Sequence, residues 1–104
     1  MDLDLERVFV REARERVREM HRALEGGGAD RYAMFRHAHS LKGLAGSLGH
    51  EEVAALAADI VARLRDDEGR VREPDAADDA AVKEDIGRLV GEVERVAVAT
   101  EDQA

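Results

Sequence analysis

The sequence has no cysteine, no tryptophan and a single proline among its 104 residues, and only 3% of its residues are aromatic. Without cysteine, the chain can form neither a disulfide framework nor a thiolate metal site, which suits a reducing compartment. A core with so few aromatic rings has to be built from aliphatic side chains. Because proline interrupts helices, a chain with Pro74 alone leaves room for long helices.

No apolar run comes near the length of about 18 residues that is needed to cross a membrane, and the acidic N-terminus does not resemble a signal peptide. A cytoplasmic location is therefore expected. The formal net charge of −8 argues against broad binding to nucleic acid or to anionic membranes. The length and the 38% of charged residues predict one small domain over residues 1–104 with a well solvated exterior.

The spacing of apolar residues predicts four amphipathic helices. Because their connections are mostly short, they predict an all-α fold, an antiparallel up-down-up-down four-helix bundle. The charged stretch 67–79, which contains Gly69 and Pro74, is expected to be a loop, and residues 100–104 are expected to fray. The predicted helices are residues 4–25, 31–48, 51–66 and 78–99.

Glycines and acidic residues mark the expected helix ends. Glycines 26–28 are expected to stop the first helix, and Asp30 is a good N-cap for the second. Gly49 is expected to be a plain helix stop after the second helix.

The second predicted helix has an unusual exposed face around His39. With successive residues about 100° apart, the apolar residues fall on one side and His39 lies nearly opposite to them. Lys42, Gly43 and Gly46 follow His39 on its own face. Since a helical glycine costs about 1 kcal/mol relative to alanine, two of them beside an outward histidine indicate that a partner needs close access. The apolar stripe consists of Met34, Ala38, Leu41, Ala45 and Leu48.

This face suits phosphoryl transfer. A neutral imidazole is a nucleophile, and Lys42, one turn along, places an ammonium near the phosphoryl oxygens. The chain has no Gly-rich loop of the Walker type and no carboxylate cluster arranged for magnesium, and it is too short for a separate ATP-binding domain. A phosphoryl group must therefore arrive from one partner and leave to another, so the chain is expected to be a phosphocarrier without its own ATP site.

The segment His39-x-x-Lys42-Gly43, followed by Ala45, Gly46, Leu48 and Gly49, resembles the histidine-containing phosphotransfer (Hpt) domain. It is also similar to the N-terminal phosphotransfer domain of chemotaxis histidine kinases. The resemblance implies that the ε nitrogen of His39 is phosphorylated and that the partners are a histidine kinase and response-regulator receiver domains. The receiver's aspartate and magnesium would supply the catalysis, and no cofactor or small-molecule substrate is implied for this chain.

A docking patch is expected beside the histidine. Tyr32 and Arg36 fall on the His39 side of the helix, and Phe35 lies at the edge of the core. Together with Leu44 they form a small apolar and basic surface that suits a receiver domain. The alternative interpretation is that Phe35 merely completes the core.

The other three histidines are not expected to join the site. His37 lies two positions from His39 and so points away from it. His21 and His50 are expected to be surface or loop residues, with His50 at a turn that approaches the partner surface. No two histidines are spaced three or four residues apart, so a metal site is not expected.

One position departs from the family pattern. Many Hpt domains, as the resemblance implies, place Gln or Glu on the third helix to hydrogen-bond the phosphorylatable ring, and here Val61 occupies that position. The ring is then held less firmly, or another group orients it.

Three alternatives to a phosphorelay carrier remain open. The chain is similar to the phosphotransfer domain of a chemotaxis-type kinase cut from a longer protein, although its compact ends favour a free-standing one. A docking or inhibitor module of the same shape would bind a receiver or kinase without carrying phosphate, and Val61 supports that interpretation. A plain helical interaction domain is the third. A monomer is expected, although the apolar stripes also permit a dimer.

Overall fold

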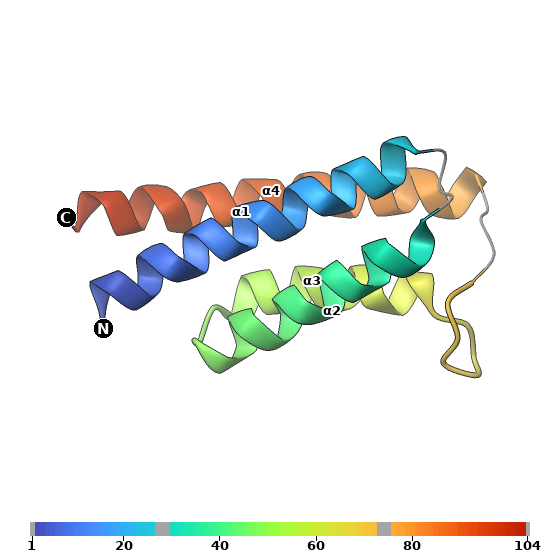
Figure 1. The fold of residues 1–104 in the computed structure, drawn as a ribbon, viewed down its shortest axis with the longest axis horizontal. Coiled ribbons are helices and arrows are strands. Elements are labelled where there is room, and N and C mark those ends of the chain that lie inside the picture. Colours follow the sequence, from blue (N-terminus) through green and yellow to red (C-terminus); the bar gives the residue numbers. More distant parts are fainter. Residues whose placement is uncertain (1, 27–29, 73–75, 104) are drawn as a thin grey trace.

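The computed structural model describes residues 2–26, 30–72 and 76–103. These residues form four α-helices and no strand, so the all-α class is confirmed (Figure 1). One isolated bridge joins Arg65 to Val71 in the connection after the third helix. The helices are α1 (Leu3–Glu25), α2 (Arg31–Ser47), α3 (Glu51–Leu64) and α4 (Ala76–Asp102).

The predicted caps lie at the helix ends. The Asp30 carboxylate accepts a hydrogen bond from the Ala33 amide at 3.0 Å, which satisfies a free N–H of the first turn of α2. Gly49 has φ +80°, a left-handed conformation that favours glycine, and the next amide, of His50, donates to the Ala45 carbonyl. Gly26 is the C-cap of α1, and the glycines expected to follow it at 27 and 28 lie outside the described residues.

Two helices differ from the predicted bounds by two or more residues, and the other two differ by one residue each. α3 ends at Leu64, two residues early, because Arg65 is extended and pairs with Val71. α4 begins at Ala76, so residues 76–79, expected to belong to the loop 67–79, are helical. It continues to Asp102, so residues 100–102, expected to fray, are helical as well. Thr100 is buried, and its hydroxyl donates to the Val96 carbonyl, which helps to hold this last turn.

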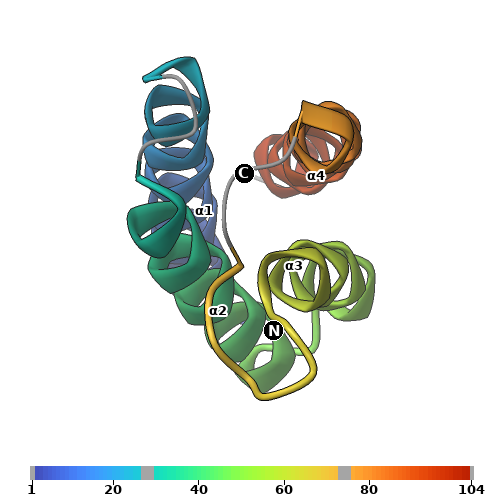
Figure 2. The same cartoon turned by 90° about the vertical axis from the view of Figure 1, so that its right-hand side faces the viewer.

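The four helices surround one aliphatic core (Figure 2). α1 packs against α2 and α4, and α3 packs against α2 and α4, so each helix has two neighbours. α1 and α4 are longer than the other two and extend beyond them at the end where the two chain termini lie (Figure 1). The largest fully buried side chains are Phe9, Met20, Met34, Leu41, Ile60, Leu64, Ile86 and Leu89.

Phe9 joins α1 to the turn between α2 and α3. It is fully buried, and the His50 ring stacks on it with the centroids 4.1 Å apart and the planes at 15°. The His50 Nε2 atom lies 2.9 Å from a Glu6 carboxylate oxygen, and both side chains are largely buried, at 14% and 8% exposure. His50, expected to approach the partner surface, is instead held inside the bundle by α1.

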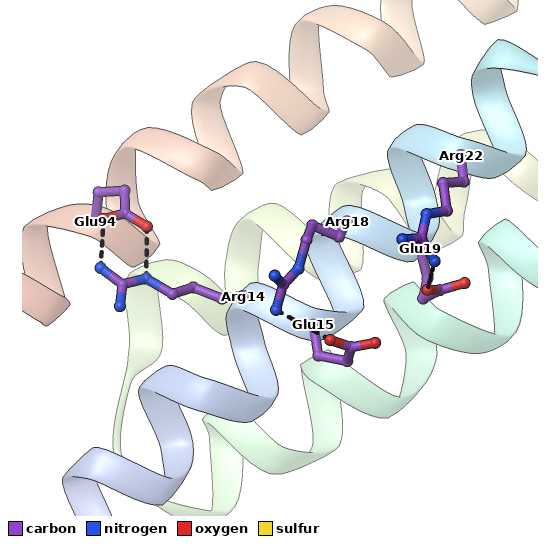
Figure 3. Close-up of polar contacts among 6 residues, drawn as sticks. All are labelled: Arg14, Glu15, Arg18, Glu19, Arg22 and Glu94. Atoms are coloured by element: carbon purple, nitrogen blue, oxygen red, sulfur yellow. Dashed lines mark hydrogen bonds and ion pairs between the residues drawn. The ribbon is translucent and has the colours of Figure 1, made fainter.

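Ion pairs join α4 to the other helices. The Arg14 guanidinium of α1 donates two hydrogen bonds to the Glu94 carboxylate of α4, at 2.8 and 2.7 Å (Figure 3). Arg31 of α2 pairs with Asp79, and Arg63 of α3 pairs with Asp85. The exposed pairs within α1, such as Arg18 with Glu15, are solvated and are worth less than about 1 kcal/mol each (Figure 3).

We predict that Phe9→Ala lowers the free energy of unfolding by about 3–5 kcal/mol, because it empties a fully buried site and removes the surface on which His50 stacks. The measurement is urea denaturation followed by circular dichroism. Val98→Ala, at an exposed position of α4, is the control and should change stability by less than about 0.5 kcal/mol. Equal effects of the two substitutions would contradict this account of the core.

Candidate functional site

The outer face of α2 is formed by the residues that its buried side leaves exposed. Met34, Ala38, Leu41 and Ala45 are buried against the other helices. His39 is exposed on the outer side, at the middle of the helix. Lys42, one turn further along α2, is exposed as well. The helical period alone brings the imidazole and the ammonium to the same face.

Gly43 and Gly46 leave bare backbone on this face. Both are helical and exposed, and a Cβ built at either would meet nothing within 4 Å. Neither glycine is therefore required by packing inside the protein. Since glycine weakens a helix interior, the bare surface fits a requirement for close approach from outside.

The His39 ring has an aromatic neighbour one turn back along α2. The centroids of the His39 and Phe35 rings lie 5.8 Å apart, with the planes tilted by 40°. Phe35 is half-buried and packs against the core, so it both completes the core and contributes to the surface. On that ring lies the Arg65 guanidinium from the end of α3, 4.7 Å from the centroid.

Arg65 is a residue of this site that the sequence analysis missed. It lies four residues after Val61, directly beyond the end of α3, and its contact with Phe35 places it against α2. Val61 itself is only 6% exposed, so this position offers no polar group to the His39 ring. The sequence did offer one signal for it. Val61 is apolar at the position that orients the histidine ring in the family, and the cationic Arg65 follows it four residues later.

The remaining residues of the expected docking patch lie nearby on α2. Tyr32 is 62% exposed, and the Arg36 guanidinium lies over its ring, 5.4 Å from the centroid. Leu44 is half-buried and packs against the core. The patch therefore combines two arginines stacked on aromatic rings with an apolar edge.

His37 is turned away from His39, toward α1. The Arg16 guanidinium donates to His37 Nδ1 at 3.0 Å, which leaves the proton of the neutral ring on Nε2. Burial lowers the pKa of His37, and the positive charge of Arg16 lowers it further. His37 therefore serves the α1–α2 contact and shares no proton with His39.

The histidines do not gather into a cluster. His21 lies on α1, His37 faces α1, and His50 is stacked on Phe9. Within residues 2–26, 30–72 and 76–103, no group of three His, Cys, Asp or Glu side chains is placed to hold a metal ion. None of the helices in these segments is long and apolar enough to cross a membrane.

The site combines a histidine exposed on the second helix of a four-helix fold with an exposed lysine and an exposed glycine about one turn further on. The model of the Hpt domain matches residues 4–99, nearly the whole chain. The chain belongs to the Hpt domain family. Hpt domains take part in histidine phosphotransfer in phosphorelays, where they work with receiver domains and histidine kinases. Comparison with curated proteins and with solved structures found no match.

The lowered pKa of His37 predicts a pH dependence of stability. Below a pH of about 6.5, His37 binds a proton more readily in the unfolded chain than in the folded protein. The free energy of unfolding therefore falls as the pH drops. We expect His37→Gln to show a shallower fall than the wild type between about pH 6.5 and 5.5. Urea denaturation at several pH values measures it, and parallel curves for the two proteins would contradict the account.

Gly43→Ala should separate stability from docking. A Cβ there meets nothing in the free protein, so the free energy of unfolding should rise by up to about 1 kcal/mol, while phosphotransfer should slow because the methyl group obstructs a partner. Gly87→Ala on α4 is a matched control, since that glycine is also exposed and helical with open space around it. It should stabilise to a similar degree and leave phosphotransfer unchanged. If Gly43→Ala is also without effect on transfer, the clearance role is wrong.

Proposed function

We propose that this protein relays a phosphoryl group through His39 between response-regulator receiver domains in a two-component phosphorelay. The observation that supports it most is the face of α2. An exposed imidazole lies one turn from an exposed lysine, and the glycines beside them have open space around them. Membership of the Hpt family supports the reaction class.

The transfer itself requires little from the carrier. The neutral Nε2 of His39 attacks the phosphorus of a receiver's aspartyl phosphate, an N–P bond forms, and the P–O bond to the aspartate breaks, which releases the carboxylate. The imidazolium formed then loses its Nδ1 proton to water. Onward transfer reverses these steps on a second receiver. Such reactions depend mainly on positioning and on neutralisation of the phosphoryl oxygens.

Two cations of this chain are placed to neutralise the phosphoryl group. Lys42 lies one turn from His39 on the same helix. Arg65 lies over the Phe35 ring, whose other neighbour is His39. We assign Lys42 the closer contact with the phosphoryl oxygens and Arg65 a second positive charge, which partly replaces the polar group absent at Val61.

The proposal assumes the up-down-up-down bundle expected from the sequence, with adjacent helices antiparallel, acting as a monomer. The colour order of Figure 1 supports it, because the chain leaves the end with the termini along α1 and returns to it along α4. With α2 and α3 joined by a short turn, their outer sides form one continuous surface for a partner.

We expect incubation with a phosphorylated receiver to label this protein, and His39→Gln to reduce the label to background, because the acceptor nitrogen is gone. The assay is transfer of radiolabelled phosphate followed by gel autoradiography. His21→Gln, a histidine of α1 remote from the α2 face, is the control and should be labelled like the wild type. Labelling that survives His39→Gln would mean that another residue is the acceptor.

A second candidate is a docking module of the same shape that binds a receiver or kinase without carrying phosphate. The burial of Val61 favours it, because an apolar residue stands at the position that orients the ring in the family. In that case His39→Ala leaves both binding and inhibition of the partner unchanged. The phosphotransfer domain of a chemotaxis-type kinase is distinguished by the length of the parent gene.

A further inference from the structure

We infer that this chain selects receiver domains whose face around the phosphorylatable aspartate has a surplus of surface carboxylates, and that it recognises them with Arg36, Lys42 and Arg65. The inference rests on the proposed function, since it names the kind of partner that the His39 face fits.

The first observation is that α2 contains no acidic residue. The chain has 24 Asp and Glu among 104 residues, yet none lies in the 17 residues of α2. One basic residue of this helix, Arg31, is 3% exposed and paired with Asp79. The exposed cations of α2 are therefore Arg36 and Lys42, on a helix where no carboxylate offsets them.

The second observation is that the arginines of this face are held by aromatic rings and not by carboxylates. Arg36 lies over Tyr32 and Arg65 over Phe35. Within the described part of the chain, neither arginine nor Lys42 forms an ion pair, whereas arginines of α1 and α4 such as Arg14 and Arg88 do. A guanidinium stacked on an aromatic ring is already positioned, so it loses little conformational entropy when a partner binds. Its N–H groups remain available to a carboxylate of that partner.

The row of α3 residues that leads to Arg65 consists mostly of small and apolar residues. Glu51, Ala54, Ala58 and Val61 follow one another at helical spacing, and Arg65, directly after α3, contacts Phe35 of α2. The exposed carboxylate of this row, Glu51, therefore lies at the opposite end of α3 from Arg65. Asp59 falls on the other side, where its charge acts on Arg63, the partner of Asp85 in α4.

In the connection after Arg65, two of the acidic side chains have partners of their own. The Asp66 carboxylate accepts hydrogen bonds from the amides of Glu68 and Arg70, and the Glu68 carboxylate pairs with Arg70 at 3.5 Å. These contacts hold the two carboxylates within the loop, where they remain exposed, as does Asp67 between them.

The occupant that these charges favour is a protein and not a nucleic acid. The chain as a whole has a net charge of −8, which repels a polyanion. Half-buried Phe35 and Leu44 give that face an apolar edge, as protein interfaces have. An acidic receiver would be repelled by the net negative charge of the chain and attracted by this face, so the charges also orient the encounter.

The test measures docking and transfer separately. Binding of unphosphorylated receivers from the source organism to the His39→Gln protein is measured by calorimetry at low salt and at about 0.5 M salt, where surface charges are largely screened. Arg36→Glu and Arg65→Glu are added to this protein singly. Lys83→Glu, an exposed residue of α4 with no ion pair in the described structure, makes the same change in net charge and is the control. Transfer rates are measured in the same variants with His39 intact.

We expect receivers to rank by the acidity of their docking face, and each arginine reversal to weaken binding and kcat/KM for transfer about three- to tenfold at low salt, with the difference shrinking at high salt. Lys83→Glu should differ from the parent by less than about twofold. Equal losses in Lys83→Glu, or unchanged binding and salt dependence in both arginine variants, would overturn the inference. Receiver binding without labelling of His39 would instead reject the proposed function and leave the charge-based docking supported.

Discussion

The rotation of α2 about its own axis is the constraint on which the site depends. Four buried residues on one side of this helix, Met34, Ala38, Leu41 and Ala45, fill the space between it and its neighbours. Burying a methionine or leucine side chain contributes about 1.5–3 kcal/mol, so turning the helix by one residue would cost several kcal/mol. That packing directs His39, Lys42, Gly43 and the other outer residues toward the solvent.

The same face combines features that weaken the protein with features that suit a partner. Gly43 and Gly46 lower helix propensity and make no internal contact, and two arginines are stacked on aromatic rings with no carboxylate beside them. The opposite side of the bundle is different, since α1 and α4 are joined by the Arg14–Glu94 pair and have further pairs along their surfaces. The contrast is consistent with one side built for stability and the other for contact.

Much of the fold could be predicted from the sequence because it depends on local rules. The helical period identified the stripe of α2, Asp30 and Gly49 marked its ends, and the exposure of His39 followed from the period. The predicted helix ends near residues 65 and 76 were less accurate. The third helix ends early because Arg65 has an extended backbone that pairs with Val71.

The contacts that were missed join residues distant in the sequence. His50 was expected at the surface, but it stacks on Phe9 of α1 and pairs with Glu6, more than forty residues away. Arg65 reaches Phe35 from another helix. No periodicity within one helix predicts which side chain of a neighbouring helix will meet it, so these pairings needed the packed structure.

The central claim is that His39 accepts a phosphoryl group on Nε2, and NMR of the protein with ¹⁵N-labelled histidine tests it most directly. After incubation with a phosphorylated receiver, the account predicts a phosphorus coupling to Nε2 of His39 and to no nitrogen of His21, His37 or His50. A coupling at any of those three rings, or none at all while a receiver is shown to dock, would contradict it.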